Sequence, residues 1–388
     1  MEKSSTVEFR AFDPTMLLNW FDDEKRAFPW RRTGDPYAIW VSEIMLQQTR
    51  AATVVPYFLS FMRHFPTVEA LARSTEMAVL KSWEGLGYYS RAKNLREGAR
   101  YVLENHNGDL PRTYSEIIKV PGIGDYTAGA ILSLAFNLPI PAVDGNVVRV
   151  FVRLTDSTWT QGNIKDRRLC RRYVASELEA WPSSAAGINE ALIELGATIC
   201  APRRPRCDIC PLSPHCEARQ SGRAHLLPLR RPPKKKPIES LTILILQNQA
   251  SKKVLVTQRP ADGLLADLWE FPSLSGHMSD AEIRRTLVAH GQNPLRIQHL
   301  PARRHIFTHL IWDLQAWHCV VEPTGNRSGA PVALKIKPDG FSHLSLVEDG
   351  GSDAEWANMI SGDWVDAADL EQLPFSAALI PYRDISLF

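Results

Sequence analysis

Four of the six cysteines in this 388-residue chain lie close together. They are Cys200, Cys207, Cys210 and Cys216, within the stretch CAPRRPRCDICPLSPHC. Four thiolates can surround one soft metal centre, and both a zinc ion and an iron–sulfur cluster accept such a ligand set. Zinc ribbons usually use two short C-x2-4-C pairs, whereas here only Cys207 and Cys210 form a short pair. The spacing therefore favours an iron–sulfur cluster over zinc, and over unligated thiols.

Two carboxyl groups have sequence surroundings that favour different protonation states. Glu43 is the only acidic residue from Pro36 to Val68, and its neighbours are apolar, so we expect burial to raise its pKa. Asp144 directly precedes a helical run in PAVDGNVVRV, and a helix N-terminus favours the ionised carboxylate. A protonated acid beside a charged carboxylate is a pair used in acid–base catalysis. Each residue also has a structural interpretation, Glu43 as an exposed helix residue and Asp144 as a helix cap.

A glycine-rich stretch, VPGIGDYTAG (120–129), lies between two segments with helical character. Before it, Thr113 and Glu116 fit a helix-capping pattern. Gly122 and Gly124 can adopt positive φ and let another molecule approach the backbone, and the N-terminus of the following helix favours an anion. No lysine or hydroxyl residue stands at the spacing of a nucleotide P-loop. The hairpin is therefore either a structural turn or a phosphate-binding element.

Basic charge is concentrated beside the cysteines. Residues 200–237 contain ten Lys and Arg residues and two Asp and Glu residues, although the whole chain has a net charge of only +2. Such a run is either a solvated linker or a phosphate-binding surface. Arg203, Arg204 and Arg206 lie between the first two cysteines, where a metal-bound loop would hold them in fixed positions. Together with the hairpin, this arrangement favours binding to the phosphodiester backbone of DNA.

The pattern of apolar residues divides the chain into two parts. Residues 1–216 have apolar residues at three- and four-residue spacing, which predicts a mostly helical domain. Residues 217–237 are rich in Pro, Lys and Arg and predict a linker. In residues 238–388, short β-type runs on either side of QNQAS predict a hairpin within an α+β domain. Residues 321–361 contain several glycines and little periodicity, and they predict an inserted loop.

The composition is that of a globular domain protein, with 44% apolar and 23% charged residues. No apolar run approaches the length of a membrane span. The first residues, MEKSSTVEFRAFDP, contain acids and no apolar core of a signal peptide. We therefore expect a cytosolic protein whose thiols are reduced.

The chain resembles the helix-hairpin-helix DNA glycosylases that carry a C-terminal iron–sulfur loop, and within them the A/G-specific adenine glycosylase family. The glycine hairpin and the cysteine spacing are both marks of this group. The resemblance covers nearly the whole chain, and its further motifs are FPWR (28–31), SEIMLQQT (42–49), GLGYYSRA (85–92), PGIGDYTAGAILS (121–133), VDGNVVRV (143–150) and NEALIELGA (189–197). It implies two helical subdomains with a cleft between them, an appended Nudix-like domain, and a [4Fe–4S] cluster on the four cysteines.

The resemblance also implies how these residues act on DNA. Glu43 would protonate a flipped adenine, while Asp144, with Asn146 beside it, stabilises the cationic sugar or forms a transient covalent adduct. In the related endonuclease III-type enzymes, a lysine that attacks the sugar stands where this chain has Tyr126. A tyrosine cannot form a Schiff base, so we expect an abasic product and little lyase activity. The residues that match those around the flipped adenine are Arg26, Trp30, Arg31, Leu46, Tyr126 and Glu190.

The family implies a separate set of residues at the base opposite the adenine. Gln48 and Tyr88 match residues that wedge near that base when the adenine leaves the stack, with Thr49 and Leu86 beside them. Without the resemblance, Trp30, Leu46 and Leu86 could equally be ordinary core residues, and Gln48 a solvated helix residue.

The C-terminal domain is expected to bind without hydrolysing nucleotides. Residues 258–272 resemble the start of a Nudix domain, but no glutamate-rich magnesium-binding helix follows them. The loop 303–310 matches the one that reads 8-oxoguanine, with Phe307, Thr308 and His309 at its tip. A serine is common where Thr308 stands, and threonine keeps the hydroxyl group while adding a methyl group.

These matches predict a monomeric base-excision enzyme of the bacterial cytosol or nucleoid. Its substrate would be duplex DNA that contains adenine opposite 8-oxoguanine or guanine. One alternative is a thymine-mismatch or oxidised-pyrimidine glycosylase, against which Glu43 within SEIMLQQT and the appended domain argue. Another is a protein that marks lesions without chemistry, against which the set of Glu43, Tyr126 and Asp144 argues.

Overall fold

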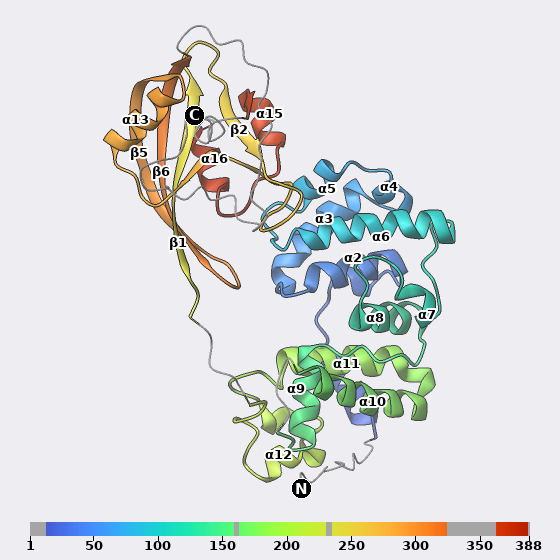
Figure 1. Ribbon diagram of the computed structural model, residues 1–388. Coiled ribbons are helices and arrows are strands. Elements are labelled where there is room, and N and C mark those ends of the chain that lie inside the picture. Colours follow the sequence, from blue (N-terminus) through green and yellow to red (C-terminus); the bar gives the residue numbers. More distant parts are fainter. Residues whose placement is uncertain (1–12, 159–162, 230–234, 324–361, 387–388) are drawn as a thin grey trace. The chain divides into compact units, whose positions relative to one another are not determined.

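The computed structural model describes residues 13–158, 163–229, 235–323 and 362–386 (Figure 1). The chain forms two compact units, one made of Met1–Ser74 with Lys93–Pro233 and the other of Thr75–Ala92 with Lys234–Phe388. We call them the helical unit and the C-terminal unit. None of the described helices is long and apolar enough to cross a membrane.

The helical unit consists of two groups of helices. The first group contains α2 (Pro36–Leu46), α3 (Ala51–His64), α4 (Val68–Ala72), most of α6 (Ser90–His106), α7 (Tyr114–Ile117) and α8 (Asp125–Phe136). The second contains α1 (Thr15–Glu24), α9 (Gly145–Leu154), α10 (Ile164–Ala180), α11 (Ala185–Thr198) and α12 (Glu217–Gln220). Helix α11 packs against α1, α8 and α9 and so joins the two groups. The predicted mostly helical fold with two subdomains is confirmed.

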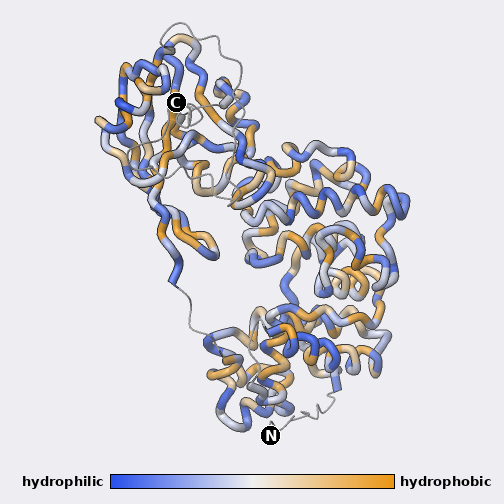
Figure 2. Tube along the Cα trace, viewed as in Figure 1, coloured by the Kyte–Doolittle hydropathy of each residue, from blue (hydrophilic) through white to orange (hydrophobic). Residues whose placement is uncertain are grey.

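Two helices of this unit are unusual because they are buried almost all round. In α2, every residue from Tyr37 to Met45 is buried, and in α9 every residue from Val147 to Leu154 is buried. Apolar residues are concentrated along such helices and along the central strands of the C-terminal unit (Figure 2). Because these helices are buried on all sides, their ionisable side chains, Glu43 on α2 and Arg149 and Arg153 on α9, lie in low-dielectric surroundings.

The glycine hairpin joins α7 to α8, and its details differ from the predicted ones. Gly122 has a φ of 80°, as predicted, but Gly124 has a φ of −97° and is extended. The capping pattern before α7 does not form, because the Thr113 hydroxyl donates to Glu116 Oε2 at 2.6 Å and makes no cap hydrogen bond. Helix α8 therefore begins after one left-handed residue rather than two.

The predicted linker 217–237 is shorter in the structure. Residues 217–220 form α12, and Ala218, Ala224 and Leu227 are buried in the core that α9 and α11 build. The prediction was wrong for this part because it rested on the Pro, Lys and Arg content and did not consider these three apolar residues, which pack into the core. Residues 230–234 lie outside the described part of the chain.

The C-terminal unit contains a seven-stranded sheet with the order β3-β2-β1-β6-β5, in which β4 pairs with β1 and β7 with β2. The strands are β1 (Ile238–Asn248), β2 (Val254–Gln258), β3 (Trp269–Glu270), β4 (Ser273–Ser275), β5 (Gln292–Ile306), β6 (Ile311–Pro323) and β7 (Asp363–Val365). β1 and β2 form the predicted hairpin, and β1 runs parallel to β6. The mixed sheet with helices confirms the α+β prediction.

Helices cover both faces of this sheet. Helix α13 (Asp280–Ala289) places Ile283 and Leu287 in one apolar core, while α15 (Ala367–Gln372) and α16 (Ile380–Ser386) contribute Leu370 and Tyr382 to the core on the other face. Most of the predicted inserted loop 321–361 lies outside the described residues, and its first three residues complete β6.

One segment of the N-terminal half belongs to the C-terminal unit. Residues 75–92, with α5 (Glu76–Ser82), group with the sheet domain and not with the helical unit. The predicted domain of residues 1–216 is therefore interrupted. The contacts responsible join residues almost 300 positions apart in the chain, such as Glu84 and Arg383.

Substituting alanine at Gly122 is expected to destabilise the helical unit by about 1–3 kcal/mol. A Cβ atom there would need a positive φ and would lie 2.8 Å from Asn94 Cβ. At Gly124 a Cβ atom would stand in open space, so Gly124→Ala is the matched control. Thermal unfolding should show a lower midpoint for Gly122→Ala only, and equal midpoints would contradict this account.

Candidate active site

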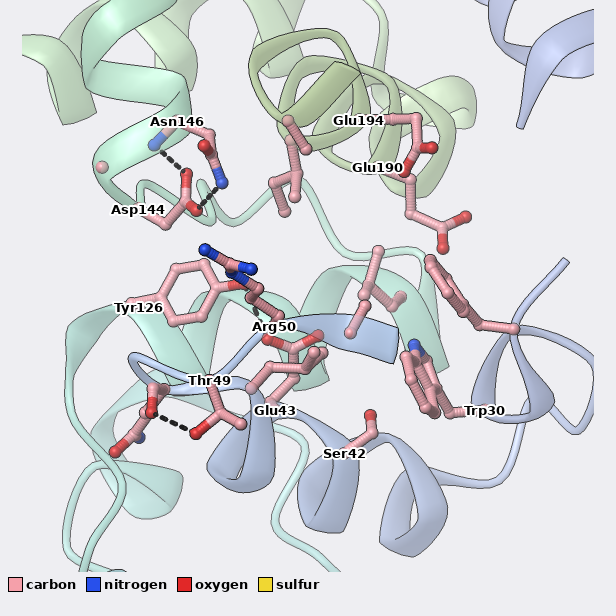
Figure 3. A pocket seen from close by; sticks show the side chains of 18 of the residues that line it. Trp30, Ser42, Glu43, Thr49, Arg50, Tyr126, Asp144, Asn146, Glu190 and Glu194 are labelled. Atoms are coloured by element: carbon pink, nitrogen blue, oxygen red, sulfur yellow. Dashed lines mark hydrogen bonds between the residues drawn. The ribbon is translucent and has the colours of Figure 1, made fainter. Parts of the chain in front are cut away.

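A cavity of about 950 Å³ lies in the helical unit, beside α2 and α11 and the first turns of α8 and α9 (Figure 3). Carboxylates, guanidinium groups and aromatic rings all line it. The predicted site residues of this unit that line the cavity are Arg26, Trp30, Arg31, Glu43, Leu46, Gln48, Thr49, Tyr126, Asp144, Asn146 and Glu190. Segments far apart in the sequence thus contribute to one site.

Glu43 projects from the buried helix α2 into this cavity and is 5% exposed. The Tyr126 hydroxyl, from the first turn of α8, donates to Glu43 Oε2 at 2.6 Å. The pKa of Glu43 is raised to about 7, mainly by burial; the Tyr126 hydrogen bond and Arg31 oppose this shift, and the charges of Asp144 and Glu190 add to it. The expected raised pKa is thus found. Because Tyr126 occupies Oε2, a proton on Oε1 is available to a molecule in the cavity.

Tyr126 itself stays neutral in this position. Burial and the charge of Glu43 raise its pKa well above the ordinary value for tyrosine. The phenol therefore remains a hydrogen-bond donor to the carboxyl group and does not compete with Glu43 as an acid.

Asp144 caps the N-terminus of α9 and faces the same cavity. Its Oδ1 accepts hydrogen bonds from the backbone N–H groups of Asn146 and Val147, both at 2.8 Å, and its Oδ2 accepts one from Asn146 Nδ2 at 2.6 Å. Burial raises the pKa of Asp144, and these hydrogen bonds and Arg149 oppose the shift. The net direction is upward, opposite to that expected from a helix N-terminus alone, because the carboxyl is buried as well as capped.

Asn146 is held in turn by Arg149 and by a close helix crossing. Arg149 Nη2 donates to Asn146 Oδ1 at 2.7 Å and to the Gly196 carbonyl at 2.6 Å, and its Nε donates to the Cys200 carbonyl at 2.8 Å. A Cβ atom on Gly196 would lie 2.6 Å from Asn146 Cβ. Only glycine lets α11 approach α9 this closely, so the orientation of Asp144 depends on this crossing.

An ion-pair network forms another wall of the cavity. Glu194 is fully buried and contacts Arg26 Nε at 2.5 Å and Arg31 Nη2 at 2.9 Å, while Glu190 lies 3.2 Å from Arg31 Nε. Burial alone would raise the pKa of Glu194, but the hydrogen bond from Arg26 and the charge of Arg31 lower it overall. Sequence analysis missed Glu194, although its i,i+4 spacing from Glu190 puts both residues on one face of α11.

Aromatic and apolar side chains make the remaining wall. The Trp30 ring is 5% exposed, lies 4.8 Å from the Phe28 ring at an interplanar angle of 12°, and meets Phe58 edge-on. Leu46, at the end of α2, lines the same cavity. Flat aromatic surface of this kind accommodates a planar heterocycle.

The chain turns sharply after α2, where Gln48 has a φ of 58°. Positive φ is uncommon for residues other than glycine, and such strain is often found at functional sites. Thr49 and the next residue, Arg50, also line the cavity, and Figure 3 shows the Arg50 side chain directed into it. Arg50 was not predicted, because its basic side chain carries no distinguishing sequence signal.

The other predicted opposite-base residues lie in the C-terminal unit. Leu86 is buried, whereas Tyr88 is 43% exposed, has a φ of 50°, and places its hydroxyl 2.7 Å from Thr308 Oγ1. Phe307, Thr308 and His309 form the turn between β5 and β6, as predicted. Within this unit the structure thus brings Tyr88 to the tip of the β5–β6 hairpin.

The four cysteines line a second, small cavity beside the buried Arg153 of α9, and all four are free thiols. Arg153 Nη1 donates to Cys200 Sγ at 3.2 Å, and Arg153 Nη2 is buried without a hydrogen-bond partner among the described residues. In the described part of the chain, no group of three or more Cys, His, Asp or Glu residues is arranged to hold a single metal ion. A buried cation beside four sulfurs nonetheless fits a thiolate-ligated group of negative charge.

Comparison with known proteins agrees with this architecture. Residues 41–176 match the HhH-GPD superfamily of base excision DNA repair proteins, and residues 242–383 match the NUDIX domain. The fold and the site together therefore define a base-excision DNA glycosylase with an appended Nudix domain.

Individual relatives narrow the assignment. The adenine DNA glycosylase of Homo sapiens is 36% identical over 79% of this chain and 66% of its own length. That of Mus musculus is 35% identical over 85% of this chain and 75% of its own length. The chain belongs to the adenine DNA glycosylase family, whose members hydrolyse the N-glycosidic bond of adenine in DNA.

Among solved structures, a thermostable thymine-DNA glycosylase is 29% identical, with a TM-score of 0.49. The match covers 53% of this chain and 94% of that chain.

Replacing Glu43 by glutamine is expected to stabilise the helical unit at alkaline pH. The folded-state pKa of about 7 lies above the ordinary value of 4.5, so the unfolded chain loses this proton first and wild-type stability falls as pH rises through that window. Above pH 7 the full penalty, on the order of 3 kcal/mol, remains. Glutamine carries no charge and still accepts the Tyr126 hydrogen bond.

Urea unfolding at pH 5 and pH 8 measures this effect. The gain in Glu43→Gln should be larger at pH 8, whereas the exposed Glu104→Gln should show no pH-dependent gain. An equal gain at both pH values would disprove the raised pKa.

Proposed function

We propose that this enzyme excises adenine paired with 8-oxoguanine or guanine in duplex DNA and releases an abasic site. It would act as a monomer in the bacterial cytosol. The observation that carries the proposal is the pairing, in one cavity, of Glu43, whose pKa is raised to about 7, with Asp144 at the N-terminus of α9. Membership of the adenine DNA glycosylase family supports the choice of base.

The residues divide the reaction between them. The adenine leaves the base stack and enters the cavity, where Trp30 and Leu46 offer apolar surface to its ring. Glu43 gives its proton to a ring nitrogen as the bond to the sugar breaks, so the bonding electron pair leaves with a neutral base. The sugar becomes cationic, and the Asp144 carboxylate stabilises that charge until water adds and loses a proton.

Tyr126 supports a reaction that stops at the abasic site. Its phenol is neutral, partly buried and hydrogen-bonded to Glu43, and it has no amine that could form a Schiff base with the sugar. The enzyme would therefore have little lyase activity of its own.

The opposite base would be read by Gln48 and Thr49 of the helical unit and by Leu86, Tyr88 and the β5–β6 turn of the C-terminal unit. Within the C-terminal unit, the hydrogen bond between Tyr88 and Thr308 supports a joint role. A threonine hydroxyl can donate to or accept from an oxidised purine, as a serine hydroxyl can.

We further propose that Cys200, Cys207, Cys210 and Cys216 hold a [4Fe–4S] cluster. The shared cavity and the buried Arg153 guanidinium support it. Such a cluster would fix the loop that carries Arg203, Arg204 and Arg206, and these arginines with the hairpin of Gly122 and Gly124 would bind DNA phosphates.

Single-turnover release of free base tests the reaction. We expect fast adenine release opposite 8-oxoguanine, slower release opposite guanine, and strand breaks only after alkali. Glu43→Gln and Asp144→Asn should each lower the rate by at least about 10³-fold while duplex binding persists. A duplex with a thymine–guanine mismatch is the control, and thymine release, or breaks without alkali, would refute the proposal.

Metal analysis tests the cluster separately. The purified protein should be brown and contain iron and sulfide in equal amounts, about four of each per chain. Cys210→Ser should lower this content, whereas Cys319→Ser, which alters a buried cysteine of the C-terminal unit, should not. A colourless protein that contains only zinc would disprove the cluster.

A further inference from the structure

Glu84 joins stretches of chain that are far apart in the sequence. Its Oε1 accepts hydrogen bonds from Arg383 Nη1 at 2.7 Å and from the Phe375 N–H at 2.8 Å, and its Oε2 lies 2.9 Å from Lys81 Nζ. The side chains of Glu84 and Arg383 are only 12% and 9% exposed. Both carboxylate oxygens are engaged, so the pair has one favoured geometry. Removing either charge would leave the other, poorly exposed one with fewer partners, which are Lys81 for Glu84 and Asp384, at 3.3 Å, for Arg383.

The turn that follows Glu84 is fixed to the same region. The Tyr89 hydroxyl donates to the Phe375 carbonyl at 3.1 Å, so both polar groups of that peptide residue bind this segment. Trp83 Nε1 donates to the Gly87 carbonyl at 3.1 Å and closes the turn. Tyr88 protrudes from this turn in its left-handed conformation.

Arg383 is also linked to strand β5, which leads into the β5–β6 turn. It lies on α16, where the neighbouring Tyr382 hydroxyl donates to the Pro301 carbonyl of β5 at 3.1 Å. Strand β5 then runs to Ile306 and the turn of residues 307–310. One helix therefore holds both the Glu84 segment and the base of the β5–β6 hairpin, and the two meet again where Tyr88 bonds Thr308.

We propose that Glu84 and Arg383 are a positioning pair that sets the preference of the enzyme for 8-oxoguanine over guanine. The pair fixes the position of Tyr88 relative to the β5–β6 turn, so that both can contact the opposite base together. Neither residue lines the cavity of Glu43 and Asp144, so the pair acts on selection and leaves bond breaking unchanged. This inference rests on the proposed function.

The test compares single-turnover rates of adenine release opposite 8-oxoguanine and opposite guanine, with the full-length protein. In Arg383→Gln and in Glu84→Gln, the ratio of the two rates should fall about tenfold, the effect of a lost charged hydrogen bond. The rate opposite guanine should stay within about twofold of wild type. The double variant should lose less than the two single effects multiplied together, because both substitutions remove the Glu84–Arg383 interaction.

Arg284→Gln is the matched control, because it breaks an Arg–Asp pair on α13 of the same unit that does not touch residues 75–92. Its rate ratio should equal that of wild type. If wild type itself shows no preference, the proposed function fails. If wild type has the preference and both single variants keep it, or if both rates fall by the same factor, only the positioning role fails.

A second variant covers loss of folding. Should circular dichroism show that the ion-pair variants do not fold, Tyr88→Phe removes one exposed hydroxyl and the bond to Thr308. A lower ratio of the rates opposite 8-oxoguanine and guanine supports the joint role of Tyr88 and the β5–β6 turn, and an unchanged ratio overturns it.

Discussion

Ionising a carboxyl group inside an apolar helix is unfavourable, and the active site depends on that constraint. Helix α2 is buried from Tyr37 to Met45, and Glu43 has no exposed position on it to occupy. The proton is therefore retained up to about pH 7. Without this burial, the glutamate would be ionised at neutral pH and could not serve as the acid of the proposed reaction.

The second carboxyl, of Asp144, is partly buried, and its surroundings provide more hydrogen-bond donors. Three N–H groups donate to the two oxygens of Asp144. Two are the backbone N–H groups of Asn146 and Val147, and the third is on the Asn146 side chain. Glu43 instead has one phenol hydroxyl. The two acids thus differ in the number of donors they face, and in the proposed reaction this difference separates the acid from the charge stabiliser.

Sequence analysis found the features that depend on local pattern. The apolar neighbours of Glu43 foretold its burial, and the position of Asp144 before VVRV foretold its cap. It failed where a local pattern competes with tertiary contacts. Gly124 turned out to be extended, and the Thr113 hydroxyl binds a carboxylate rather than the backbone. The grouping of residues 75–92 with the C-terminal unit was not predictable, because periodicity carries no information about partners almost 300 residues away.

That grouping has a consequence for synthesis of the protein. Glu84 and Arg383 are 299 residues apart, and ribosomes add about 5–20 residues per second, so Glu84 waits about 15–60 s for its partner. During that interval the buried surfaces of Tyr89 and Leu86 lack the chain that later covers residues 75–92. The segment therefore gains its contacts only after α16 has been synthesised, and that helix completes a unit whose first helix is α5.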